Sequence, residues 1–170
     1  MNFYELAQKR YSCRKFSDKK VERELIDQIV AAANAAPTAV NKQPFQIFLV
    51  DTPEAREKLV KTSRYTYGAK TFLVVGYREN EGWVRGCDGR NFADVDATIA
   101  ATHAMMEICE LGLGTTWVGD FDAALLKEMF PEMAGHELIA IFPIGYPAED
   151  DQPNPTHFVR KAAEEILTVL

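Results

Sequence analysis

The sequence predicts an α+β fold, with a central sheet of about four or five strands flanked by helices. Short runs dense in β-forming residues recur along the chain, and segments with helical spacing separate them. The chain has 170 residues, 47% of them hydrophobic, so it can bury one real core but not two. We therefore expect one domain over residues 1–170, with the strand directions left open.

Helices are predicted where apolar side chains recur at helical spacing between capping residues. Asn2 and Glu5 form a capping-box pattern at the first helix, with Phe3 expected on its inner side. Pro37 ends the second helix, and Gly112 ends the longest, which is nearly apolar through its centre and should be buried. The predicted helices cover residues 2–9, 22–35, 52–62, 94–111 and 122–130.

Strands are predicted in short runs of β-branched and aromatic residues. These runs cover residues 45–50, 71–77, 115–118 and 138–142, and Pro143 ends the last of them. Residues 79–92 carry several charges and glycines, so an exposed loop is expected there. After Tyr146 the chain becomes polar and proline-rich, and we expect residues 147–170 to form a tail that packs on a partner subunit.

Charge and composition exclude several classes of function. A net charge of −6 argues against nucleic acid or an anionic membrane as a partner, because an excess of Lys and Arg binds phosphate. No apolar run approaches the ~20 residues of a bilayer span, and no secretory signal begins the chain, so a cytoplasmic protein is expected. Cys13, Cys87 and Cys109 are far apart and the histidines are scattered, so no disulfide or metal site is expected.

The first candidate binding motif is Arg10-Tyr11-Ser12-Cys13-Arg14, which follows a predicted helix end. In an extended chain alternate side chains point the same way, so two guanidiniums and one hydroxyl share a side. Arg gives bidentate, charge-assisted hydrogen bonds, which suit a phosphate or carboxylate. The alternative is an ordinary solvated basic turn.

Two further segments could contact a flat ligand. The loop over residues 36–45 carries Asn41 and Gln43, whose carboxamides can read a ring edge, although Asn and Pro are also ordinary turn formers. In residues 111–121 several glycines allow close backbone approach, and Trp117 offers a surface for stacking or packing. This segment is no dinucleotide fingerprint, because Trp117 stands where the third glycine belongs.

Taken together and in this order, these segments resemble the nitroreductase family of flavin enzymes. Residues 10–16 are similar to its R-x-S-x-R-x-F opening, and residues 36–45 to its A-P-S-A-x-N-x-Q-P-W/F loop. Residues 112–119 are similar to G-L-G-x-x-W-I-G, residues 141–147 to its closing strand with G-Y-P, and residues 160–161 to its terminal R-K. The family's proline after R-K is Ala162 here, and residues 79–92 match no family motif.

The resemblance implies a nitroreductase-like layered fold and a homodimer with FMN bound at the subunit interface. Arg10, Ser12 and Arg14, joined by Arg160, would hold the phosphate end of the cofactor. Val118 and Gly119 would present backbone to the flavin ring, including an amide near the redox-active nitrogen. The full set of cofactor-binding residues implied is Arg10, Tyr11, Ser12, Arg14, Pro37, Thr38, Ala39, Asn41, Gln43, Trp117, Val118, Gly119 and Arg160, with Asn41 contributed by the other subunit.

The implied activity is an FMN-dependent transfer of electrons from NADH or NADPH to a small-molecule acceptor. A nitroaromatic, a quinone, a flavin or an enone would serve as this acceptor. The sequence identifies no side chain as catalytic acid or base. Two alternatives remain open at this point: a flavin-binding carrier or sensor without turnover, and a small interaction domain that binds a protein partner.

Overall fold

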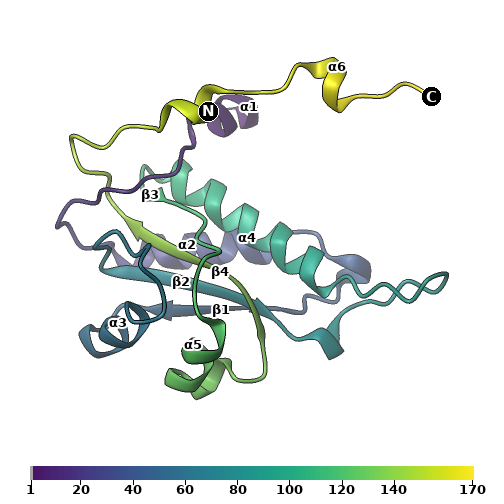
Figure 1. Ribbon diagram of the computed structural model, residues 1–170, viewed down its shortest axis with the longest axis horizontal. Helices are drawn as coiled ribbons and strands as arrows, with labels where there is room; N and C mark the ends of the chain where they lie inside the picture. The colour runs from purple at the N-terminus through teal and green to yellow at the C-terminus, as the bar shows by residue number, and fades with distance from the viewer. Residues whose placement is uncertain (1) are drawn as a thin grey trace.

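The computed structural model describes residues 2–170, which form a sheet with helices packed around it (Figure 1). In these residues the sheet has four strands in the order β1-β2-β4-β3, and every neighbouring pair is antiparallel. The predicted α+β class is therefore confirmed, and the strand directions are now known. The strands are β1 (Phe45–Val50), β2 (Thr71–Tyr77), β3 (Gly114–Thr115) and β4 (Glu137–Gly145).

The helices lie near their predicted positions and are mostly a little shorter. Asn2 caps the first of them, and its capping box with Glu5 is formed as predicted. The helix predicted to be longest is the longest one found, and seven of its side chains are buried. The helices are α1 (Phe3–Lys9), α2 (Arg23–Asn34), α3 (Pro53–Leu59), α4 (Ala93–Glu110), α5 (Ala123–Met129) and α6 (Ala163–Ile166).

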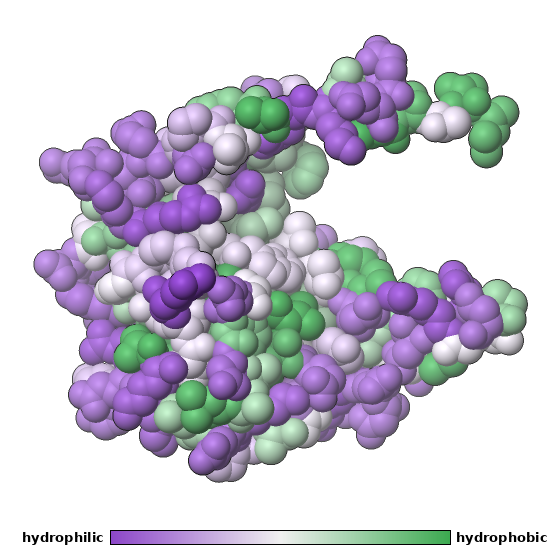
Figure 2. Space-filling model, in the orientation of Figure 1, coloured by the Kyte–Doolittle hydropathy of each residue, from purple (hydrophilic) through white to green (hydrophobic). Residues whose placement is uncertain are grey.

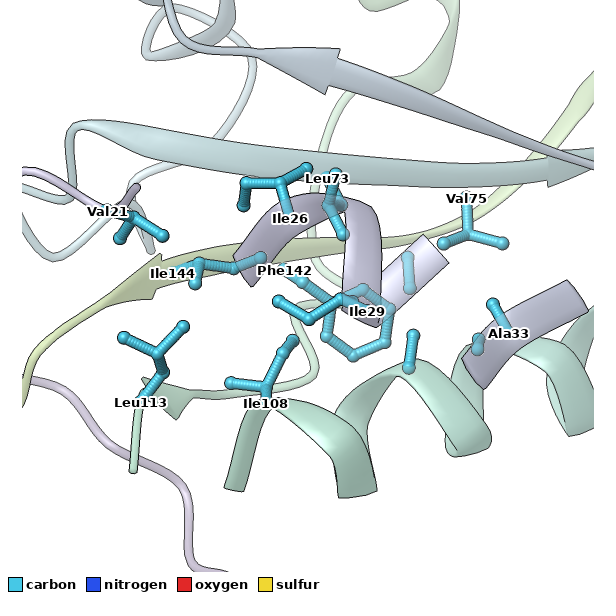
Figure 3. Close-up of a cluster of buried hydrophobic side chains, with 13 residues drawn as sticks. Val21, Ile26, Ile29, Ala33, Leu73, Val75, Ile108, Leu113, Phe142 and Ile144 are labelled. Atoms are coloured by element: carbon cyan, nitrogen blue, oxygen red, sulfur yellow. The ribbon is translucent and has the colours of Figure 1, made fainter. Parts of the chain in front are cut away.

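Each face of the sheet carries its own hydrophobic core. Helices α2 and α4 cover one face, where Ile29, Ile108 and Phe142 are fully buried together (Figure 3). On the other face α3 and α5 pack over a second cluster that includes Phe72 and Leu126. Successive residues of a strand point to opposite faces, so one strand such as β2 can supply both cores.

Pro143 lies inside β4, opposite Phe72, which corrects the predicted end of this strand. The N–H of Ile141 donates to the Val118 carbonyl at 3.0 Å, so N–H groups at alternate positions of β4 face the β3 side. On that side, the segment between Thr115 and Val118 is not paired with β4. A missing N–H at Pro143 therefore costs no ladder hydrogen bond.

The segment between β2 and α4 projects from the body as a narrow arm (Figure 1). It begins with a short 3-10 helix, η2 (Glu79–Glu81), and continues as two strands of chain bridged between Val84 and Asn91. At its base the rings of Trp83 and Phe92 meet edge to face, with centroids 5.4 Å apart. The predicted exposed loop is thus found, although paired backbone and aromatic packing give it an order that the sequence did not predict.

The chain after β4 first returns to its own N-terminal segment. Ser17 donates its N–H to the Tyr146 carbonyl at 2.8 Å, and Ala148 donates to the Lys15 carbonyl at 3.0 Å. Lys15 also pairs with Asp150 at 2.5 Å. Residues 147–151 are therefore held by the same chain, so the expectation of a tail on a partner subunit now concerns residues 152–170.

Residues 152–170, here called the C-terminal arm, extend beside α1 and away from the body (Figure 1). The ring nitrogen Nε2 of His157 lies 3.4 Å from the Gln8 carbonyl oxygen of α1. Helix α1 buries none of its residues, and Phe3 is 75% exposed, so its predicted inward position is wrong within the single chain. Figure 2 shows an open recess between the C-terminal arm and the rest of the molecule.

Candidate functional site

The first candidate motif lies against the glycine-rich segment that follows α4. Ser12 forms a parallel bridge with Thr115, and the Cys13 N–H donates to the Thr115 carbonyl at 3.0 Å. Gly114 permits this approach, because a Cβ there would come within 2.5 Å of the Cys13 Sγ. The fold thus places residues 10–14 beside residues 114–119, although a hundred residues separate them in sequence.

The guanidiniums of Arg10 and Arg160 lie near each other, and Arg14 follows on the same extended segment; none of the three has an acidic partner among the described residues. Within residues 2–170, no ion pair joins Arg10, Arg14 or Arg160 to a carboxylate. Burial lowers the pKa of Arg10, and the nearby positive charge of Arg160 acts in the same direction. Arg14 donates from Nη1 to the Ser12 carbonyl at 3.0 Å, and Arg160 donates from Nη1 to the Val159 carbonyl at 2.8 Å. The remaining N–H groups of these arginines are available to an anion. A basic turn that is merely exposed to water would not require this arrangement.

A buried carboxylate lies beneath this arginine strand. Asp151 is 8% exposed, and its Oδ1 accepts the Arg14 N–H at 3.4 Å. Burial raises the pKa of Tyr11, and the nearby Asp151 carboxylate raises it further, so this hydroxyl stays protonated. Burial likewise raises the pKa of Cys13 to about 12, again with a contribution from Asp151. Tyr11, predicted as a cofactor contact, therefore lies near this carboxylate, whose Oδ2 has no hydrogen-bond partner among the described residues.

A pocket of about 250 Å³ opens beside Arg14, and residues 116–120 form one wall of it. The chain is fixed there because Val118 and Ile141 exchange two backbone hydrogen bonds of 3.0 Å. Gly119 is exposed, and its N–H donates to no atom among residues 2–170. A Cβ on Gly119 would meet no described heavy atom within 4 Å, so the side-chain direction at this residue is open.

Tyr65 and Tyr67 complete the pocket, and sequence reasoning missed both of them. Their rings lie 6.2 Å apart, and Tyr67 has a left-handed backbone with φ of 52°. The signal for them in the sequence was a pair of aromatic residues in a turn that has neither helical nor strand spacing.

The Trp117 ring faces the core: it packs edge to face on the core residue Phe142, with centroids 5.1 Å apart. Of the two roles left open for Trp117, packing is therefore the one that this contact favours.

The second candidate motif forms a strained loop after α2. It contains a 3-10 turn, η1 (Ala39–Asn41), in which Val40 and Asn41 have φ of 45° and 58°. Gln43 has φ of 50°, donates its N–H to Thr38 Oγ1 at 3.1 Å, and donates from Nε2 to Asn41 Oδ1 at 3.0 Å. Left-handed backbone is uncommon outside glycine and is typically kept at functional sites. The sequence also allowed an ordinary turn here, and an ordinary turn would not need so many left-handed residues outside glycine.

Another buried carboxylate supports this loop. Asp96 is 2% exposed in the first turn of α4, and its Oδ1 accepts the Ala39 N–H at 2.9 Å. Sequence reasoning missed Asp96 as it missed Asp151. The signal was present for Asp96, because an acidic residue inside an otherwise apolar helical pattern requires a partner when buried.

The structure thus divides the predicted site residues into two groups. The arginine half-site comprises Arg10, Tyr11, Ser12, Arg14, Trp117, Val118, Gly119 and Arg160, and the loop half-site comprises Pro37, Thr38, Ala39, Asn41 and Gln43. Helix α4 separates them, since Asp96 lies at its start and Cys109, the neighbour of Arg10, at its end. At 1.5 Å per residue this separation is about 20 Å. Within one chain the two half-sites therefore lie toward opposite ends of α4.

Other kinds of site are not found in the part of the chain that the structure describes. Residues 2–170 hold no group of three or more His, Cys, Asp or Glu side chains arranged to bind a metal ion. Among the same residues, no helix has both the length and the apolar character needed to cross a membrane.

Comparison with known proteins gives one consistent family. The family model described as "Nitroreductase family" matches residues 7–65 and 60–146 of this chain. A relative from Methanothermobacter thermautotrophicus, described as an NADH dehydrogenase/NAD(P)H nitroreductase, is 29% identical over 88% of this chain and 80% of its own length. An NADPH-dependent oxidoreductase of Staphylococcus haemolyticus is 26% identical over 89% of this chain and 67% of its own.

Solved structures agree with this assignment. A nitroreductase family protein from Clostridium difficile has a TM-score of 0.90 and 34% identity, over 99% of this chain and 98% of that one. A protein from Exiguobacterium sibiricum, described as a nitroreductase in complex with FMN, has the same fold, with a TM-score of 0.84 and 17% identity over 100% and 98% of the two chains. Because the family model covers most of the sequence and the first of these structures matches nearly its whole length, the chain belongs to the nitroreductase family.

Proposed function

We propose that the protein is an FMN-dependent oxidoreductase that transfers electrons from NADH or NADPH to a small acceptor such as a nitroaromatic, a quinone or a flavin. The observation that carries this proposal is the arginine half-site: its guanidiniums have no acidic partners, and Arg14 lines the same pocket as Gly119, whose N–H donates to no described atom. The names of the relatives support the donor, and the FMN complex with the same fold supports the cofactor.

The residues present fit FMN at both of its ends. A phosphate is dianionic and accepts several hydrogen bonds, which Arg10, Arg14 and Arg160 can supply as charge-assisted donors. The ring system is flat and carries nitrogen and oxygen acceptors, which suit an exposed backbone amide such as that of Gly119. Ser12 adds a hydroxyl on the same side as the arginines.

We propose that two chains form a homodimer in which each FMN site joins the arginine half-site of one chain to the loop half-site of the other. The separation of about 20 Å along α4 supports this, because one chain cannot contact one ligand with both groups. The C-terminal arm supports it too, since large apolar side chains there are solvent-exposed in the single chain. These are Phe158, Val159, Ile166, Leu167, Val169 and Leu170.

Bound FMN would supply the redox chemistry, accepting hydride and passing electrons onward. The protein's own residues bind, orient and polarise. Arg14 and its neighbours fix the phosphate, and the Gly119 N–H stabilises negative charge that develops opposite it. Because the chain has no dinucleotide-binding fingerprint, we propose that NAD(P)H and the acceptor use the pocket beside Tyr65 and Tyr67 in turn, in a ping-pong cycle.

The test is spectroscopic and starts with the purified protein. We expect bound flavin with an absorption band near 450 nm, about that of oxidised flavin, and a dimer by light scattering. Anaerobic mixing with NADH or NADPH should bleach this band within the turnover time. Adding a quinone or nitroaromatic after the nicotinamide is removed should restore it. A flavin that neither nicotinamide bleaches would contradict the reductase and leave a carrier or sensor.

A second experiment tests the shared site. Arg14→Ala damages the arginine half-site, and a double variant, Asn41→Ala with Gln43→Ala, damages the loop half-site. If each site draws on both chains, co-expression should restore about a quarter of the sites, because half of the randomly mixed dimers carry one intact site. Co-expressed chains that form mixed dimers and regain no activity would show that a single chain supplies the whole site.

A further inference from the structure

Asp96 combines features that its helix does not need. It is 2% exposed, and within the described residues its Oδ2 has no hydrogen-bond partner. An unsatisfied buried carboxylate oxygen costs free energy, and such a group calls for an explanation. Its place in the first turn of α4 reduces this cost, because the helix dipole favours a negative charge there.

The contact made by the other oxygen supplies an explanation. Asp96 Oδ1 accepts the N–H of Ala39, the residue immediately before the left-handed pair Val40 and Asn41. The turn then closes on itself, because Asn41 donates its N–H to the Thr38 carbonyl at 3.0 Å. A left-handed conformation is unfavourable for residues other than glycine, so a loop with several such residues relaxes unless something holds it. The hydrogen bond from Ala39 to Asp96 is placed to hold it.

We propose that Asp96 is a positioning residue for flavin binding: it fixes the loop half-site of its own chain in the shape that contacts the flavin ring in the partner's site. This inference rests on the proposed function. Asp96 would not touch the flavin, and its effect would pass through the backbone at Ala39. It should therefore act on the ring end of the cofactor and leave the phosphate end unchanged.

Riboflavin separates the two ends, because it has the ring of FMN without the phosphate. Fluorescence titration of the apo dimer with each ligand measures both affinities. For Asp96→Ala we expect FMN and riboflavin affinities to fall by the same factor, about tenfold or more, as expected for loss of a hydrogen bond to a charged group. At saturating flavin, the visible circular dichroism of the bound ring should also change.

Three variants sharpen the measurement. Asp96→Asn keeps an acceptor for Ala39 and should retain affinities within about threefold of wild type, since a neutral hydrogen bond is the weaker kind. Ala39→Pro removes the N–H itself and should reproduce Asp96→Ala; Thr38, with φ of −132° and ψ of 158°, tolerates a following proline. Asp94→Ala is the control, because Asp94 in the same turn pairs with Arg90 at 2.9 Å instead.

The outcomes distinguish this inference from the proposed function. Wild-type protein that binds no FMN would overturn the proposed function. Wild-type protein that binds FMN while Asp96→Ala and Ala39→Pro match it in affinity and circular dichroism would overturn only the role of Asp96. A loss confined to FMN, or no rescue by Asp96→Asn, would also overturn it. Should Asp96→Ala fail to fold, Ala39→Pro decides, because it leaves the buried carboxylate in place.

Discussion

The two half-sites, which we propose hold one ligand together, are built in opposite ways. The arginine half-site is a stretch of extended chain joined to the sheet margin, and it offers guanidiniums. The loop half-site is a 3-10 turn with left-handed residues and neutral side chains. Each rests on a buried aspartate, Asp151 in one case and Asp96 in the other. From this difference we expect the first half-site to bind by charge and the second by a preformed shape.

The largest expected effect lies in the arginine half-site, at the Gly119 N–H, which we propose to face the flavin ring. Gly119→Pro removes this N–H, and we expect the rate of flavin bleaching by NAD(P)H to fall about a hundred- to a thousand-fold. Enzymes lose about this much rate when they lose a hydrogen-bond donor that stabilises charge developing in the transition state. Stopped-flow absorbance measures this rate. Flavin affinity should change much less, because the phosphate contacts remain.

Gly119→Ala is the matched control, since it keeps the N–H. A Cβ there meets no described heavy atom within 4 Å, and the φ of Gly119 is not in the left-handed region. We expect bleaching within about threefold of wild type, because no hydrogen bond is lost. Equal rates in the Pro and Ala variants would show that the Gly119 amide has no role in the reaction.

The next largest effect distinguishes binding by charge at the arginine half-site from binding by shape at the loop half-site. Arg14→Ala should weaken FMN binding about tenfold or more, the scale of ~1.5–3 kcal/mol for a hydrogen bond to a charged group. Riboflavin affinity should stay unchanged, in contrast to the equal losses expected for Asp96→Ala. Fluorescence titration with both ligands provides the measurement.

Arg23→Ala serves as the control for Arg14, because Arg23 is exposed on α2 and pairs with Asp27 at 2.9 Å, outside both half-sites. Arg64 suits this purpose less well, since its guanidinium lies 4.8 Å from the centre of the Tyr65 ring, which lines the pocket. If Arg14→Ala weakens riboflavin as much as FMN, Arg14 does not bind the phosphate.

The same comparison explains what the sequence could predict. The strands at residues 45–50 and 71–77 and the long helix were predictable because apolar periodicity is local. The arginine motif was predictable for a similar reason, since alternate residues in an extended chain share a side. Asp96, Asp151, Tyr65 and Tyr67 escaped because their roles arise from contacts between distant segments. Pro143 was misplaced because the gap in its neighbouring strand is a tertiary feature.

A smaller effect is expected from strain in the loop half-site. Val40 is β-branched, 71% exposed and held at φ of 45°, so it has a strained backbone and little packing to lose. Val40→Gly should stabilise the apo protein by about 1 kcal/mol, a Tm increase of roughly 2–4 °C for a domain of this size. The same change should weaken flavin binding a few-fold, because the loop is less well ordered in advance.

Val60→Gly is the control for Val40, because Val60 is also exposed but has an ordinary φ of −64° at the end of α3. Calorimetry of both apo variants should show a gain for Val40→Gly and none for Val60→Gly. A gain in neither variant would mean that Val40 stores no strain.

The smallest effect is a dependence of stability on alkaline pH that arises at Cys13, which lies between Ser12 and Arg14 of the arginine half-site. Burial raises the pKa of Cys13 to about 12, against about 8.5 in an unfolded chain. Between these values the folded protein holds a proton that the unfolded chain has released, so the free energy of unfolding falls as pH rises. Below about pH 8 both states hold the proton, and this contribution is fully present.

Cys13→Ser removes this titration while keeping a small polar side chain against Gly114. We expect the Tm of wild type to fall more than that of Cys13→Ser between about pH 7.5 and 9.5, a range in which an unfolded Tyr scarcely titrates. Cys109, whose pKa burial also raises, is present in both proteins and cancels in the difference. Parallel curves would show that Cys13 stays equally protonated in both states. Asp96→Asn should keep the wild-type slope, because the loop half-site has no thiol, and this again separates the two half-sites.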